Sequence, residues 1–268
     1  MISQEALEKL LADMETDRVE KPTTFDTVPC KGSTLGDISI ELFKLRYLPS
    51  AIDPDTLAEN HRDLKQQLAS LKFYDLQEDC PTYAGILMFG NNPRFFVPGA
   101  YVQYVRFKGE DEASDFDYEY RFEGDLTTQL KQMEEFIKAN IVKMVLPELG
   151  GAYISLYPLR AIKEFLFNAV IHKDYQSNAP IKFYEFSDRI EISNAGGLYG
   201  KARPENFPNE NDYRNPALAE AVKNLGYINA FNVGVKAAIA ALKKNNSPEP
   251  EFIKDQPTSF LVKVFRRI

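Results

Sequence analysis

The most informative part of this 268-residue chain is residues 158–200, which read PLRAIKEFLFNAVIHKDYQSNAPIKFYEFSDRIEISNAGGLYG. Between Pro158 and Tyr175, apolar residues recur every three or four positions, and proline suits the first turn of a helix. Two runs typical of strands follow at 181–186 and 189–193, and after them come two consecutive glycines. The stretch therefore predicts a helix, a β-hairpin and a glycine turn.

One edge of the predicted helix is polar. Glu164, Asn168 and His172 are four residues apart, so they lie one above another beside the apolar stripe. A carboxylate near a water can act as a general base, and one amide oxygen suits an Mg²⁺ ion that keeps phosphates and waters as its other ligands. The same spacing is also the ordinary polar border of a packed helix. The helix alone leaves both interpretations open.

Two motifs, Glu164-x-x-x-Asn168-Ala169-x-x-His172-x-Asp174-Tyr175 and DRIEISNAGGL at 188–198, resemble a known family. They are similar to the RecG-C-terminal-like branch of the GHKL ATPases, which have the Bergerat nucleotide-binding fold. In that family the helix glutamate is the general base for the water that attacks the γ-phosphate, and the asparagine one turn later holds Mg²⁺. The resemblance implies a catalytic role for Glu164 and a metal-binding role for Asn168. Family members are described as transcriptional regulators.

The resemblance also implies which residues contact ATP. These cofactor-binding residues are Asn168, His172, Asn194, Gly196, Gly197, Arg214 and Gly234. Arg214 is a candidate phosphate partner, and an ion pair with a carboxylate is the alternative role for it.

The chain departs from the family pattern at two of these positions. Asn194 stands where GHKL enzymes carry an aspartate that reads the adenine amino group, so it can accept a hydrogen bond but has no charge. In the second glycine box only Gly234 remains, beside Val233, for which a positive φ is costly. The helix after Gly234 could still offer amide donors to an anion. We therefore expect weak binding of ATP and Mg²⁺, with slow or absent hydrolysis.

Composition excludes several other classes of function. Hydrophobic residues make up 44% and charged residues 26% of the chain, as in ordinary globular proteins. The net charge of −7 argues against DNA binding by this chain alone, because such binding depends on Lys and Arg that neutralise phosphates. The two cysteines, Cys30 and Cys80, are too few for a disulfide framework or a zinc site. Without an apolar segment of spanning length or a signal-peptide pattern, we expect a cytoplasmic protein without membrane contact. Homodimerisation is left open.

The sequence predicts three regions. Residues 1–21 are expected to form an acidic amphipathic helix whose end resembles the opening of the AlbA-like domain of Schlafen-like bacterial proteins, although we do not expect the body of that domain in this sequence. Residues 22–80 are expected to form a linker up to Gly36 and then a helical region, with one helix from Asp53-Pro54 to about Lys72. Residues 81–268 are expected to form the GHKL ATPase-like domain.

Further elements of that domain are predicted from periodicity and capping residues. We expect an acidic loop at Glu110–Glu119 and a polar loop at 201–211, where the ATPases place their lid. The expected strands are Thr82–Gly90, Ala100–Phe107 and Ser259–Phe265, and the expected helices begin at Gly124-Asp125, at Asn215-Pro216 and at Lys236. The fold class is α/β in the mixed α+β sense: a mainly helical N-terminal part followed by a Bergerat-like sandwich of helices on a mixed sheet.

Three functions remain open at this level. The first is a regulatory module with a divergent, weak ATP site. The second is an active Mg²⁺-dependent ATPase, and the third is an interaction or dimerisation scaffold whose nucleotide pocket is vestigial. A thermal-shift measurement with Mg-ATP separates them, because a ligand that binds the folded state raises its stability.

Overall fold

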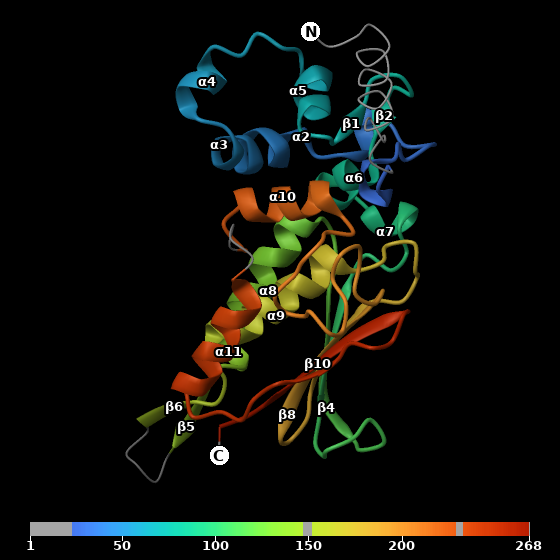
Figure 1. Cartoon of the computed structure of the whole chain (residues 1–268). Helices are drawn as coiled ribbons and strands as arrows, with labels where there is room; N and C mark the ends of the chain where they lie inside the picture. The colour runs from blue at the N-terminus through green and yellow to red at the C-terminus, as the bar shows by residue number, and fades with distance from the viewer. Residues whose placement is uncertain (1–22, 147–151, 229–232, 268) are drawn as a thin grey trace, which may run out of the picture.

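The computed structural model describes residues 23–146, 152–228 and 233–267, and of residues 143–146 and 152–154 it describes the backbone alone (Figure 1). The helix predicted at 1–21 lies outside the described residues. Within them, no helix is both long and apolar enough to cross a membrane.

A six-stranded mixed sheet forms one layer of the protein. Its strand order is β4-β3-β7-β8-β10-β9. The strands are β3 (Val102–Phe107), β4 (Phe116–Phe122), β7 (Ile181–Glu185), β8 (Arg189–Ala195), β9 (Glu251–Ile253) and β10 (Ser259–Phe265). Strands β3 and β7 are parallel, whereas the other neighbouring pairs are antiparallel. A parallel pair needs a long crossover connection, and two long helices lie within it.

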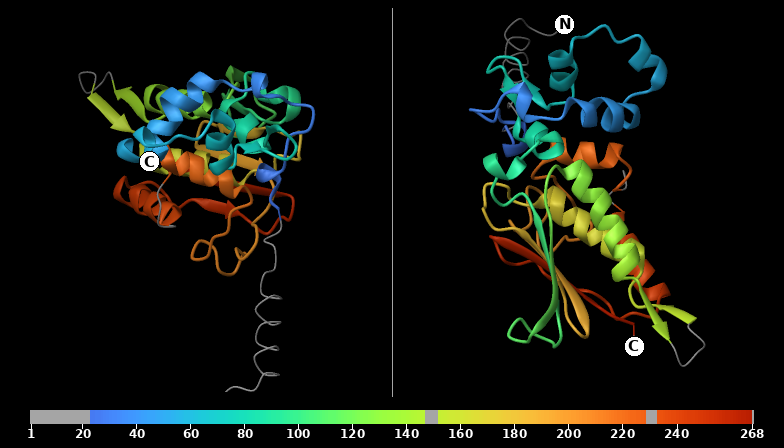
Figure 2. Two further views of the ribbon diagram at one scale, coloured as in Figure 1. Left: turned by 90° about the horizontal axis from the view of Figure 1, so that it is seen from above. Right: turned by 180° about the vertical axis from the view of Figure 1, so that it is seen from behind.

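Helices cover one face of this sheet (Figures 1 and 2). They are α8 (Leu126–Asn140), α9 (Leu159–His172) and α11 (Gly234–Lys244), whereas α10 (Pro216–Asn224) packs between α9 and the earlier helical region. Phe183, Ile192 and Val262 lie side by side on three neighbouring strands, and all three are buried in the same core as Leu166 and Val170 of α9. The helix, hairpin and closing strand predicted from the sequence are all present, and the mixed α+β fold class is confirmed.

The region before β3 is mainly helical, as predicted. It contains η1 (Phe25–Thr27), η2 (Leu35–Asp37), α2 (Ile40–Leu42), the π-helical turn η3 (Phe43–Tyr47), α3 (Leu48–Ala51), α4 (Pro54–Ala58), α5 (Leu64–Ser70), α6 (Tyr83–Phe89) and α7 (Pro93–Phe96). Two short antiparallel pairs complete the described elements: β1 (Tyr74–Asp75) with β2 (Cys80–Pro81), and β5 (Lys143–Leu146) with β6 (Ala152–Ser155). One continuous core contains both Phe43 of this region and Val264 of β10.

The prediction of a buried strand at Thr82–Gly90 is wrong, because this segment is helix α6. The Thr82 hydroxyl accepts a hydrogen bond from the Gly85 amide (3.2 Å), as an N-cap does. Residues 84–89 are all buried, so the run shows no alternation of apolar and polar residues. A short apolar run of this kind suits a buried strand and a buried helix equally well.

Other segments also differ from the predictions. The helix expected from Asp53 to Lys72 is two helices, because Asp63 and Gln66 form a new capping box that starts α5. The loop expected at 110–119 is shorter, since β4 begins at Phe116. The described part of the segment expected to be a linker packs into the core, where the Cys30 amide donates to the Pro81 carbonyl (2.8 Å).

Candidate functional site

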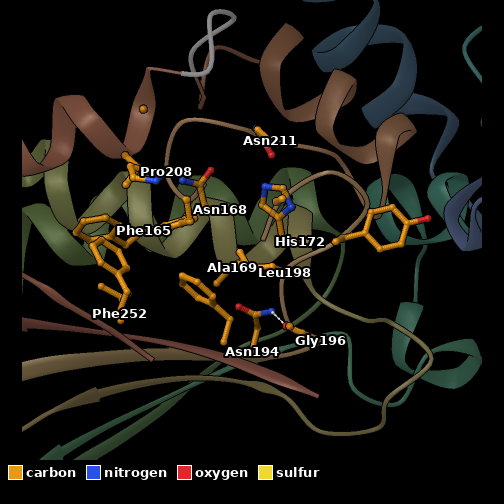
Figure 3. A pocket seen from close by; sticks show the side chains of 18 of the residues that line it. Phe165, Asn168, Ala169, His172, Asn194, Gly196, Leu198, Pro208, Asn211 and Phe252 are labelled. Carbon is orange, nitrogen blue, oxygen red and sulfur yellow. Dashed lines mark hydrogen bonds between the residues drawn. The ribbon is translucent and has the colours of Figure 1, made fainter. Parts of the chain in front are cut away.

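A pocket lies between α9, the strands β8 to β10, and the loop before α10 (Figure 3). Its volume is about 990 Å³ when the open mouth is counted. Seven of the eight residues predicted for the site line it, namely Glu164, Asn168, His172, Asn194, Gly196, Gly197 and Gly234. Arg214 is absent from the lining.

Glu164 and Asn168 form a hydrogen-bonded pair on the pocket side of α9. Asn168 Nδ2 donates to Glu164 Oε1 (3.2 Å). Burial raises the pKa of the Glu164 carboxyl, and the hydrogen bond from Asn168 and the charge of Arg160 partly oppose that rise. A raised pKa makes a carboxylate a better proton acceptor near neutral pH. An amide nitrogen only donates, so the Asn168 oxygen is the atom that can accept a hydrogen bond from a ligand or bind a cation.

Gly234 opens helix α11 directly against the Glu164 carboxylate. A Cβ atom added at Gly234 would lie 1.6 Å from Glu164 Oε1, so any other residue here would force the Glu164 side chain to move. Val233 before it has φ −101°, and the strain expected from a positive φ at this valine is therefore absent. The glycine makes room for the glutamate.

Asn194 presents a hydrogen-bond acceptor to the pocket. Its Nδ2 donates to the carbonyls of Ala195 (2.9 Å) and Gly196 (3.4 Å). Carbonyl oxygens only accept, so these two contacts fix which end of the amide is the nitrogen. The Oδ1 atom points away from Gly196 toward the space below α9 (Figure 3). A neutral acceptor thus occupies the position predicted to contact adenine.

The glycine turn after β8 is held by the segment that follows α9. The Asp174 amide donates to the Ala195 carbonyl (2.8 Å), and Gly196 has φ +93°, which favours glycine. A Cβ at Gly197 would lie 2.3 Å from the Gln256 carbonyl oxygen. The backbone therefore favours glycine at both positions, and both glycines also form part of the pocket wall.

His172 forms an aromatic wall of the pocket. Its ring stacks on Tyr213, with centroids 5.4 Å apart and an angle of 11° between the ring planes. Burial, and after it the charge of Arg214, lowers the pKa of His172 to about 4, although the charge of Asp212 opposes both effects. The imidazole is therefore neutral at neutral pH and supplies no positive charge to a phosphate.

Arg214 lies behind the glycine turn. Its guanidinium carbon is 4.8 Å from the centre of the Tyr199 ring, and Nη2 donates to the Gly197 carbonyl (3.3 Å). Because the side chain is turned toward these groups, its position does not support the predicted direct contact with a phosphate. The alternative expectation, an ion pair, is also not met among the described residues.

Sequence reasoning missed the aromatic and acidic parts of the wall. The additional rings are Phe165, Tyr199, Phe207, Tyr213, Phe252 and Phe260, and the additional carboxylates are Glu210 and Asp212. These residues come from α9, the loop before α10, β9 and β10, so no spacing in the sequence marks them as a set. Their chemistry suits a flat, aromatic ligand, since aromatic rings stack favourably on one another.

The side chains that could act as metal ligands limit how a metal ion could bind. In the part of the chain that the structure describes, no three His, Cys, Asp or Glu side chains are arranged to hold a metal ion. Asn168 Oδ1 could serve as one oxygen ligand of Mg²⁺, with phosphates and waters as the others. The site therefore fits an Mg²⁺ ion that arrives with a nucleotide.

Comparisons with known proteins support the fold. Residues 178–264 match the family described as "Putative ATP-dependent DNA helicase recG C-terminal", and this segment is RecG-C-terminal-like as predicted. The match covers β7 to β10 and does not include α9, which carries Glu164 and Asn168.

A solved structure with a similar fold is that of the DIP2311 protein from Corynebacterium diphtheriae, with a TM-score of 0.67 and 19% sequence identity. The similarity covers 94% of this chain and 49% of that one, so this chain spans about half of its length. No curated protein matches this chain.

Proposed function

We propose that this chain is a regulatory module whose pocket binds an adenine nucleotide weakly. The observation that carries the proposal is the meeting of Glu164 and Asn168 from α9 with Asn194 from β8 in one pocket with aromatic walls. The RecG-C-terminal-like segment, which belongs to a family of ATPase-like domains, supports the same ligand class. By analogy with the proteins it resembles, the regulated process would be transcription.

Two features make the binding weak. Asn194 offers a neutral acceptor in place of a carboxylate, and the loss of a charge-assisted hydrogen bond costs on the order of 1.5–3 kcal/mol, or about one to two powers of ten in affinity. The pocket lining also contains no lysine or arginine among the described residues. A bound Mg²⁺ ion would supply part of the missing positive charge, with Asn168 as its protein ligand.

An active ATPase is the second candidate function. The retained pair of Glu164 and Asn168 favours it, because burial raises the pKa of Glu164 and its carboxylate faces the pocket. In this case Glu164 accepts the proton of the attacking water and Asn168 helps to hold Mg²⁺. We expect turnover to be absent or slow, since few groups stabilise the charge of the phosphates.

Thermal unfolding with increasing Mg-ATP tests the proposal. We expect a melting temperature that rises at millimolar ligand, because only the folded chain has the pocket. The variant Asn194→Asp restores the charge and should lower the ligand concentration needed for the same shift by about tenfold. Failure to detect binding at millimolar Mg-ATP in both proteins would rule out ATP as the nucleotide that the pocket binds. Phosphate release that Glu164→Ala abolishes would establish the ATPase instead.

A further inference from the structure

The pocket wall is acidic. Among the described residues, its lining contains the carboxylates of Glu164, Glu210 and Asp212 and no lysine or arginine side chain. A ligand in the pocket therefore meets three negative groups and no formal positive charge from the lining.

Three cationic side chains lie near the pocket: two of them stack on rings of its wall, and the third is exposed. The Arg214 guanidinium lies over the Tyr199 ring, and Lys254 Nζ is 5.4 Å from the centre of the Phe207 ring. Arg160 is exposed on α9, one turn before Glu164. None of the three lines the pocket.

The end of the pocket where phosphates would be expected already holds an anion. The N-terminus of a helix attracts negative charge, and α11 begins at Gly234 with no side chain capping it. The Glu164 carboxylate lies against Gly234, so closely that a Cβ there would be 1.6 Å from Oε1. A phosphate at this helix end would have to share it with, or displace, a buried carboxylate.

The other end of the pocket suits an uncharged heterocycle. Asn194 Oδ1 is a neutral acceptor for an amino group, and the rings of Phe165 and Phe252 lie farther along the same pocket (Figure 3). His172 adds a further aromatic surface, stacked on Tyr213. The polar and aromatic groups thus favour a base and its sugar, whereas the charges disfavour phosphates.

We propose that the pocket selects an uncharged adenine nucleoside over its phosphorylated forms. This inference rests on the proposed adenine-binding function and names the ligand class of the same pocket. The affinity should fall in the order adenosine, AMP, ADP, ATP, because each phosphate brings more negative charge near Glu164, Glu210 and Asp212. Without Mg²⁺, we expect at least about tenfold weaker binding of ATP than of adenosine.

Isothermal titration of the full chain with these four ligands, with and without Mg²⁺, tests the order. Adenosine binding that is tighter than ATP and Mg-ATP binding supports the inference. Tighter binding of ATP or Mg-ATP would overturn the inference and leave the proposed nucleotide function standing. Absence of binding by all four ligands would overturn both together.

A charge variant and the salt dependence identify the cause. The variant Glu164→Gln should bind ATP about tenfold more tightly than the native chain, with adenosine affinity changed by less than about threefold. Glu220→Gln, at an exposed glutamate of α10, is the matched control and should change neither affinity. In the native chain, added salt should strengthen ATP binding, because it screens repulsion between like charges. Salt that weakens ATP binding, or equal effects of the two variants, would refute the electrostatic explanation.

Discussion

At the scale of single residues, His172 makes the stability of the protein depend on pH. Its pKa of about 4 in the folded chain lies below the ordinary value of 6.5. As the pH falls below 6.5, His172 becomes protonated in the unfolded chain but stays neutral in the folded chain. The free energy of unfolding therefore decreases until the pH reaches about 4. A difference of this size corresponds to about 3 kcal/mol.

The variant His172→Phe should therefore lose less stability than the native chain between pH 7 and pH 4.5. Phenylalanine keeps the aromatic contact with Tyr213 but cannot take up a proton. Urea unfolding at a series of pH values measures the difference, and His61→Gln, at an exposed histidine, is the control. Because Asp212 and Arg214 also face His172, the slopes of the variant and the native chain are compared at each pH. Identical slopes would show that His172 does not carry the effect.

The sequence predicted part of the site at this scale. Glu164, Asn168 and Asn194 were identified because their motifs resemble a family, and all three lie on the pocket wall. The direction of the Arg214 side chain could not be predicted, because it depends on the Tyr199 ring and the Gly197 carbonyl, both contacts made only in the folded chain. The acidic wall was missed for the same reason, since Glu210 and Asp212 line one pocket with Glu164 only in the folded chain.

At the scale of elements, Gly85 fixes how helix α6 packs against the end of α5 and the start of β1. A Cβ atom at this position would lie 2.2 Å from the Phe73 carbonyl oxygen, which belongs to a backbone that cannot easily move. That carbonyl also accepts a hydrogen bond from the Thr82 amide (3.1 Å). The close approach is therefore part of how α6 begins.

We expect Gly85→Ala to destabilise the protein by about 2–3 kcal/mol, although alanine is the better helix former. The clash with the Phe73 carbonyl has to be relieved by moving α6 out of the core. The control is Gly36→Ala, where the nearest atom to an added Cβ is 3.5 Å away. Chemical denaturation measures both variants. A Gly85→Ala protein as stable as the control would mean that α6 can shift without cost.

Helix α6 shows which kind of element cannot be predicted from a hydrophobic pattern. Helix α9 has an apolar stripe with Glu164 and Asn168 along one edge of it, so its period is visible in the sequence. The hairpin of β7 and β8 is visible too, since buried and partly exposed residues alternate along β8. Helix α6 is buried on all sides, and without a polar face its sequence carries no period. The N-cap residue Thr82 was the remaining local feature of the sequence that indicated a helix.

At the scale of the whole molecule, Asp26 joins the early part of the chain to the helix that follows the pocket loop. Its carboxylate is fully buried, and Oδ2 accepts from the Ala217 amide (2.7 Å) and the Leu218 amide (3.1 Å) at the start of α10. The expected N-cap, Asn215, instead donates to two carbonyls at the end of α9. A residue 191 positions away in sequence therefore caps this helix.

This remote cap should matter for stability and for the pocket together. Burial raises the pKa of the Asp26 carboxyl, whereas its hydrogen bonds, first that from Thr24 and then those from α10, lower it. We expect Asp26→Ala to cost about 2–3 kcal/mol of unfolding free energy, because two buried amides lose their acceptor. Asp26→Asn should cost less, since an amide oxygen can still accept one of these bonds.

Hydrogen exchange of the unliganded protein distinguishes this long-range role from a general loss of stability. In Asp26→Ala, amides of α10 and of the loop at 198–213 should exchange faster, because that loop ends where Asn215 and Asp26 hold the chain. Asp125→Ala is the matched control: Asp125 is also buried and caps a helix, but it accepts from Thr128 of its own helix α8. Its faster exchange should be confined to α8. If both variants loosen the pocket loop equally, Asp26 stabilises the fold as a whole and does not position the loop.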